Sequence, residues 1–122
     1  MNKIGILTAN LLLFDKISNI CESANFHPAK ITSLQNLKEF CEQPSETFVL
    51  LDLDFPGLNF DQLKEIIGGS RAPKGRFVGF FPHVRTDLKE LSRQAGVSVS
   101  YPNSYFFSHL AAIIQELTIP PR

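Results

Sequence analysis

The stretch Phe48-Val49-Leu50-Leu51-Asp52-Leu53-Asp54-Phe55-Pro56-Gly57 decides the fold of this chain. A continuous apolar run of this length, ended by a Pro-Gly turn, is typical of a buried strand in a parallel sheet. Its two carboxylates come where the strand ends, and open α/β sheets bind ligands at the carboxyl ends of their strands. The sequence therefore predicts an acidic site at that edge of the sheet.

Around this stretch, short apolar runs alternate with amphipathic segments, the pattern of a parallel sheet covered by helices. Five strands are predicted, at residues 3–8, 27–32, 47–52, 77–81 and 97–101. Ser33 and either Asn59 or Asp61 are predicted to cap helices, and Gly96 to end the fourth one. A single last helix is predicted to bury a stripe made of Phe106, Phe107, Leu110, Ile113, Ile114 and Leu117.

The order of the strands follows from their patterning. The first, third and fourth strands read as continuous apolar runs, whereas the second and fifth alternate and are expected at the edges. This favours the order 2-1-3-4-5 of the flavodoxin-like fold, a three-layer α/β/α sandwich. We expect one domain over residues 1–117, a Pro-rich tail over 118–122, and a crevice lined by residues 8–10, 52–54, 81–83 and 101–103.

Composition limits the classes of function. The 122 residues are 43% hydrophobic, enough for one core, and 12 basic side chains balance 12 acidic ones. The chain therefore has no general attraction to nucleic acid or to anionic membranes. The first apolar run is too short for a signal peptide or a membrane span, so a cytoplasmic protein is expected. Cys21 and Cys41 are predicted to be reduced core residues.

Residues 49–59 resemble the receiver domain of bacterial two-component response regulators, in which apolar residues precede a phosphoacceptor aspartate and a proline follows after a gap of three residues. Gln94-Ala95-Gly96-Val97 is similar to the Ala-Gly-Ala sequence that closes the fourth receiver helix. The resemblance covers nearly the whole chain. It implies that Asp52 stands at the phosphoacceptor position.

The first departure from the receiver pattern concerns magnesium. Receivers have an acidic pair after the first strand that holds Mg²⁺, and here Thr8 and Ala9 stand in its place. A hard cation of that size binds oxygen ligands, usually including carboxylates. Only Asp52, the Asp54 backbone carbonyl and water remain, so we expect poor magnesium affinity and no metal cofactor. Asp54 itself is interpreted as a solvated turn residue.

Other receiver functions are missing too. The hydroxyl residue at the end of the fourth strand is replaced by Phe81, whose ring is expected to occupy the space of a phosphoryl group. The lysine after the fifth strand is replaced by Asn103, or by Tyr101 if the following proline is matched instead. The aromatic switch position falls on Ser100 or Tyr101. The sequence thus resembles a degenerate receiver, or pseudo-receiver.

Three functions stay open at this point. The first is a noncatalytic signalling and protein-interaction module that has lost magnesium-dependent phosphorylation switching. The second is an atypical single-domain response regulator that is phosphorylated on Asp52 with the help of Mg²⁺. The third is a small flavodoxin-like ligand-binding domain or enzyme, which is disfavoured because residues 8–12 contain no glycine to wrap a phosphate.

The resemblance also implies a docking surface, formed in receivers by the fourth helix, the fifth strand and the last helix. The candidate partner-binding residues there are Tyr101, Tyr105, His109 and Ala112. Exposed tyrosine and alanine suit a protein partner or a homodimer, although ordinary surface residues would look the same.

The remaining polar candidates are interpreted as ordinary solvated loop residues. His83 follows the fourth strand and is read as a solvated loop residue, with metal binding or pH sensing as the alternative. Arg71, Lys74 and Arg76 are read as a solvated basic loop, with an acidic partner or a phosphate as the alternative.

Overall fold

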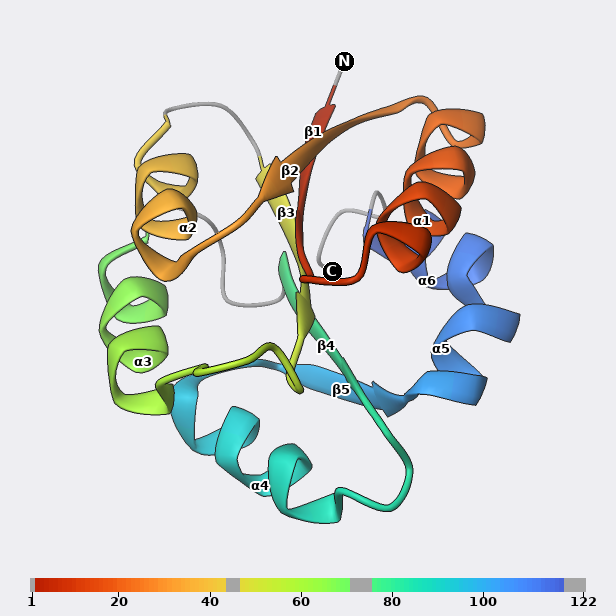
Figure 1. The fold of residues 1–122 in the computed structure, drawn as a ribbon. Helices are drawn as coiled ribbons and strands as arrows, with labels where there is room; N and C mark the ends of the chain where they lie inside the picture. Colours follow the sequence, from red (N-terminus) through yellow and green to blue (C-terminus); the bar gives the residue numbers. More distant parts are fainter. Residues whose placement is uncertain (1, 44–46, 71–75, 118–122) are drawn as a thin grey trace.

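The chain folds into a parallel sheet with helices on both faces (Figure 1). The computed structural model describes residues 2–43, 47–70 and 76–117. The sheet has five strands in the order β2-β1-β3-β4-β5, which confirms the predicted flavodoxin-like topology. The predicted tail over 118–122 and the loop residues Arg71 and Lys74 lie outside the described residues.

The elements alternate along the chain. The strands are β1 (Asn2–Leu7), β2 (Phe26–Ile31), β3 (Thr47–Asp52), β4 (Phe77–Phe81) and β5 (Val99–Pro102). The helices are α1 (Leu11–Ser23), α2 (Leu34–Cys41), α3 (Phe60–Gly69), α4 (Thr86–Ala95), α5 (Asn103–Ser108) and α6 (Leu110–Leu117).

The core lies in two layers, one on each face of the sheet. Helices α1, α5 and α6 cover one face, and α2, α3 and α4 cover the other (Figure 1). Each layer contains one free, buried cysteine, Cys21 or Cys41, as predicted. Burial raises the pKa of the Cys21 thiol to about 12 and that of Cys41 to about 11, so both thiols are protonated and unreactive at neutral pH.

Burial along the strands explains their order. All five residues of β4 are buried, whereas β2 and β5 carry exposed or half-buried residues, as edge strands do. In the interior strand β1, a side chain at Gly5 has no room. A Cβ there would lie 2.5 Å from Ile31 Cδ1 and 2.8 Å from the Phe40 ring, so glycine allows α2 to pack close to the sheet.

Polar side chains cap the first three helices, at the predicted positions Ser33 and Asn59 and also at Asn10, which was not predicted. The side chains of Asn10, Ser33 and Asn59 accept hydrogen bonds from amides in the first turns of α1, α2 and α3. Gly96 ends α4 with a φ of 104°, in the left-handed region that favours glycine.

The fifth strand starts two residues later than predicted. Val97 was expected to open it, but its amide donates to the Ser92 carbonyl while the Gly96 amide donates to Arg93. These two bonds form a Schellman motif that closes α4, so Val97 belongs to the cap of the helix. The side chain of Val97 is nevertheless buried.

The prediction of a single last helix is wrong, because the segment breaks at His109 into α5 and α6. Ser108 Oγ donates to the Ser104 carbonyl at 2.7 Å, a bond that bends helices, and His109 Nδ1 lies 3.0 Å from the Tyr105 carbonyl oxygen. Of the six residues predicted to be buried in this segment, Phe106, Leu110, Ile113 and Ile114 are buried, and Phe107 and Leu117 are only partly buried.

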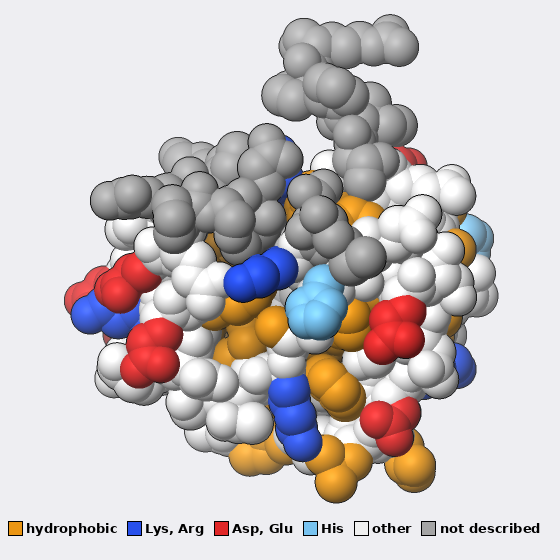
Figure 2. Space-filling view, turned by 90° about the horizontal axis from the view of Figure 1, so that it is seen from above, with side chains coloured by type: hydrophobic (Ala, Val, Ile, Leu, Met, Phe, Trp, Pro, Cys, Tyr) orange, Lys and Arg blue, Asp and Glu red, His pale blue; other side chains and the backbone are white. Residues whose placement is uncertain are grey.

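The surface carries both signs of charge. Figure 2 shows acidic and basic side chains interspersed over one face of the molecule, with hydrophobic side chains between them. No helix within the described ranges is long and apolar enough to cross a membrane.

Candidate functional site

The predicted acidic site centres on Asp52, the last residue of β3. Both of its carboxylate oxygens accept hydrogen bonds from the protein. Thr8 Oγ1 donates to Oδ2 at 2.9 Å, and the Asp54 amide donates to Oδ1 at 3.0 Å. Thr8 is 3% exposed, and its hydroxyl oxygen in turn accepts from the Asn10 amide at 3.2 Å. A short chain of hydrogen bonds therefore joins the loops after β1 and β3.

Burial raises the pKa of the Asp52 carboxyl above its ordinary value, because desolvation disfavours the charged form. The bonds from Thr8 and from the Asp54 amide act in the opposite direction, and the negative charge of Asp54 adds to the rise. Among the described residues, this carboxylate thus has two hydrogen-bond donors and no positively charged partner.

The crevice above Asp52 has a volume of about 500 Å³ and is contributed by the loops after β1, β3, β4 and β5. Its lining residues are Ala9, Asn10, Leu13, Asp52, Asp54, Pro56, Pro82 and Asn103. Four of the six predicted site residues, namely Ala9, Asp52, Asp54 and Asn103, therefore meet in one cavity. Thr8 lies behind Asp52, in contact through its hydroxyl.

The Phe81 ring was expected to fill the space of a phosphoryl group, but Phe81 does not line the crevice. Its side chain is 2% exposed and belongs to the core layer under α2, α3 and α4, and the following residue, Pro82, lines the cavity instead. No hydroxyl side chain takes its place among the residues that line the crevice.

Asn103 is the first residue of α5. Its Oδ1 atom is buried and has no hydrogen-bond partner among the described residues. The polar residues that line the crevice are thus two aspartates, Asp52 and Asp54, and two asparagines, Asn10 and Asn103. The described part of the chain contains no group of three or more His, Cys, Asp or Glu that could hold a metal ion.

Arg85, in the loop between β4 and α4, is a site residue that the sequence did not reveal. Its Nη1 lies 3.5 Å from Asp54 Oδ1, and its Nε and Nη2 each donate to Asp87 at 3.0 Å. The guanidinium lowers the pKa of Asp87. Arg85 therefore ties the loop after β4 to the loop after β3 through Asp54, which lines the crevice, although Arg85 itself is not among the lining residues. His83, in the same loop, is exposed and does not line the crevice.

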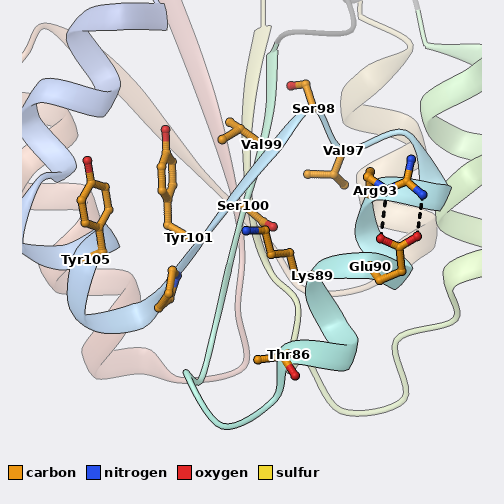
Figure 3. Close-up of a pocket in the computed structure, with 11 residues that line it drawn as sticks. Thr86, Lys89, Glu90, Arg93, Val97, Ser98, Val99, Ser100, Tyr101 and Tyr105 are labelled. Atoms are coloured by element: carbon orange, nitrogen blue, oxygen red, sulfur yellow. Dashed lines mark hydrogen bonds and ion pairs between the residues drawn. The ribbon is translucent and has the colours of Figure 1, made fainter.

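The predicted docking surface contains a second, larger cavity. A groove of about 650 Å³ runs along β5 between α4 and α5, with Tyr101 and Tyr105 on one side and Lys89, Glu90 and Arg93 on the other (Figure 3). We call it the β5 groove; its remaining lining residues are Thr86, Val97, Ser98, Val99, Ser100 and Pro102.

Three of the candidate partner-binding residues form one aromatic stack. The Tyr101 and Tyr105 rings are 5.1 Å apart and nearly parallel, and the Tyr105 and His109 rings are 4.0 Å apart with an interplanar angle of 14°. Ala112 is exposed on α6 and does not line the groove.

The fold and the acidic crevice together define the class of structure: this chain has the receiver-domain fold of two-component response regulators. A response regulator from Thermotoga maritima superposes with a TM-score of 0.76 at 14% sequence identity, covering 96% of this chain and 97% of that one. A CheY-like receiver domain from Methanospirillum hungatei gives a TM-score of 0.77 at 14% identity, covering 96% of this chain and 93% of its own.

A third similar structure holds a metal. The receiver domain of a sensor histidine kinase from Pseudomonas aeruginosa, with a magnesium ion coordinated in its active-site cleft, gives a TM-score of 0.76 at 15% identity and covers 93% of this chain and 94% of that one. No protein-family model and no curated protein matches the sequence. The likeness therefore lies in the fold.

Proposed function

We propose that this chain is a noncatalytic signalling and protein-interaction module, a cytoplasmic pseudo-receiver that works without magnesium-dependent phosphorylation. The observation that carries the proposal is the hydrogen bond from Thr8 Oγ1 to Asp52 Oδ2. It puts a neutral donor on the carboxylate at the place where a receiver has acidic metal ligands.

Magnesium binding has little support in the crevice. Mg²⁺ requires near-octahedral oxygen ligands and gives up its waters reluctantly, so it depends on carboxylates for affinity. Asp52 and Asp54 are the acidic residues that line the crevice, and Asp54 is shared with Arg85. Ala9 adds no ligand, and the guanidinium adds a positive charge that repels a cation.

Phosphoryl transfer also lacks its helpers. Catalysis of this transfer depends on positioning and on neutralising the charge of the phosphoryl oxygens. The crevice lining has no lysine and no hydroxyl side chain, and Asn103 stands where the resemblance places the lysine. Arg85 is the nearby cation, but it is already engaged by Asp54 and Asp87.

The test is a titration of ¹⁵N-labelled protein with magnesium and then with beryllofluoride, followed by amide chemical shifts. We expect no saturable shift of the amides around Asp52 at millimolar magnesium. Saturation with micromolar affinity, or a beryllofluoride adduct on Asp52, would overturn the proposal.

The matched control is Ala9→Asp, which restores one carboxylate at an exposed position of the crevice lining. This variant should bind magnesium more tightly than the wild type, because a third acidic group joins Asp52 and Asp54. A response in the variant alone would show that the titration can detect the metal.

A second candidate function is supported by the cavity above Asp52. The carboxylate of Asp52 reaches a crevice of about 500 Å³, which leaves space for a phosphoryl group once the Phe81 ring is known to lie in the core. Incubation with acetyl phosphate, followed by intact mass, separates the two functions. A gain of one phosphoryl mass in the wild type that is absent from Asp52→Asn would favour the phosphorylated regulator.

A further inference from the structure

The β5 groove has features of a binding site for an extended peptide. Its floor is the edge of the sheet, because β5 pairs with β4 on one side and ends the strand order on the other. An edge strand presents unpaired amide and carbonyl groups that can pair with a further strand. Every residue from Val97 to Pro102 lines the groove, so the part of the chain that the structure describes leaves this edge open along its length.

The usual protection of an edge strand is weak here. Natural edges are blunted by charged residues, bulges or proline. β5 has the sequence Val-Ser-Tyr-Pro, with no charge, and only Pro102 at its end lacks an amide donor. Val99 is 37% exposed. The segment from Val99 to Tyr101 is therefore available for main-chain pairing.

One wall of the groove is aromatic and already ordered. Tyr101 stacks on Tyr105, which stacks on His109, and Tyr105 is still 46% exposed. Stacked rings have lost most of their rotamer freedom before a ligand arrives, so a partner that packs on them pays little ordering entropy. An apolar or aromatic side chain of the partner fits this wall.

The opposite wall is cationic. Among the described residues of α4, Glu90 pairs with Arg93, whereas Lys89 has no ion-pair or hydrogen-bond partner (Figure 3). Lys89 points from α4 toward β5 (Figure 3). After the internal pair cancels, this wall has one positive charge, which matches an acidic side chain.

We propose that the β5 groove binds an extended acidic peptide of a partner protein by strand addition. The peptide pairs its backbone with Val99–Tyr101, directs an acidic side chain to Lys89 and packs an apolar or aromatic side chain on Tyr105. This inference rests on the proposed function, since it names the kind of partner that the interaction module takes. It gives the groove a mode of recognition in which main-chain bonds supply affinity and the two walls supply specificity.

A peptide fits the groove better than a second copy of this chain. A two-fold dimer through β5 would place the same surface on both sides of the interface. The groove of a second copy offers Lys89 no free carboxylate, because Glu90, the acidic residue among the described lining, is paired with Arg93.

The experiment is a selection from a displayed library of random twelve-residue peptides against the whole chain, without magnesium or phosphodonor. We expect the selected peptides to alternate apolar or aromatic residues with acidic ones. Labelled copies should lose roughly tenfold in affinity on Lys89→Glu and roughly thirtyfold on Tyr105→Ala. Lys64→Glu makes the same charge change at an exposed position on α3, outside the groove, and should leave affinity unchanged.

Strand addition itself is tested on the peptide. Methylating alternate peptide nitrogens removes main-chain donors, so one alternate set should abolish binding and the other should not. The inference is overturned if the selected peptides are not acidic, if they bind Lys89→Glu as well as the wild type, or if both methylated sets still bind. It is also overturned if sedimentation shows a dimer of the chain that Tyr105→Ala dissociates.

The proposed function is tested separately in the same assay. Asp52→Asn and beryllofluoride should not change peptide affinity. If either one does, the crevice switches the groove and the proposed function fails, while the peptide site stands.

Discussion

At the scale of single residues, Thr8 and Asp52 form the link that distinguishes this crevice. A threonine hydroxyl and a backbone amide occupy both carboxylate oxygens, while burial disfavours the charge. The carboxylate is therefore held in place as a structural acceptor. Such a group is costly to disturb, because a buried polar atom that loses its partner keeps its desolvation penalty.

We expect Thr8→Val to lower the free energy of unfolding by about 1–2 kcal/mol, since valine keeps the shape of threonine but removes the donor to Asp52. The Asn10 amide loses its acceptor at the same time. Urea unfolding measures the change. Thr8→Ser keeps the hydroxyl and should lose less, so a loss in Thr8→Ser as large as that in Thr8→Val would contradict the assignment of the effect to this hydrogen bond.

The pH dependence of stability gives a second prediction for Asp52. Its pKa is raised in the folded protein, so the folded state holds this proton more tightly than the unfolded chain does. Asp52 therefore makes its full contribution to the free energy of unfolding below the pKa of an aspartate in the unfolded chain. This contribution is lost as the pH rises through the raised pKa of Asp52 in the folded protein. Urea unfolding of the wild type and Asp52→Asn between about pH 3 and pH 7 measures it. The stability difference between them should shift in favour of Asp52→Asn with rising pH, and a shift in favour of the wild type would contradict the raised pKa.

At the scale of elements, patterning predicted the strands and their order because burial on one or two faces leaves a direct trace in sequence. It missed the break at His109, because the apolar stripe of Phe106, Leu110 and Ile113 continues across it at helical spacing. The bond from Ser108 to the Ser104 carbonyl depends on a rotamer, which no stripe records. Arg85 was missed for a similar reason, since its contact with Asp54 joins two loops that are distant in the chain.

The end of α4 offers a test of the capping residue. Gly96 has a φ of 104°, and a Cβ there would also lie 3.1 Å from Ile67 Cγ2. Gly96→Ala should therefore lower the free energy of unfolding by about 1–2 kcal/mol. Gly68→Ala, within α3 and with nothing within 4 Å of its Cβ, should instead raise it by about 0.5–1 kcal/mol. Chemical denaturation of the pair decides, and equal signs would refute the backbone argument.

At the scale of the whole molecule, the fold is that of receiver domains although identity to the similar structures reported above is only 14–15%. The sheet order and the position of Asp52 were predictable, because topology fixes where the carboxyl ends of the strands meet. For the crevice, the sequence predicted only that Thr8, Ala9 and Asn103 stand where receivers have charged residues. Two features were not predictable, because they depend on side-chain packing in three dimensions. One is the hydrogen bond from Thr8 to the Asp52 carboxylate, and the other is the position of the Phe81 ring in the core.

Hydrogen exchange of the backbone amides should distinguish the interior strands of the sheet from its edge strands. We expect amides of β1, β3 and β4 to exchange slowest, because these strands are paired on both sides and buried on both faces. Amides of β5 and of the six-residue helix α5 should exchange faster. Protection of β5 equal to that of β4 would mean that its edge is covered, for instance by a second copy.

The break at His109 also matters for how this fold can diversify. α6 contributes Leu110, Ile113 and Ile114 to the core, whereas α5 contributes only Phe106 among its buried residues. Mutations at the exposed α5 residues Ser104 and Tyr105 therefore meet little selection for core packing, and binding preferences can change there while the domain stays folded. We expect lineages that share this break to vary most at the exposed positions Ser104 and Tyr105 and least at Phe106.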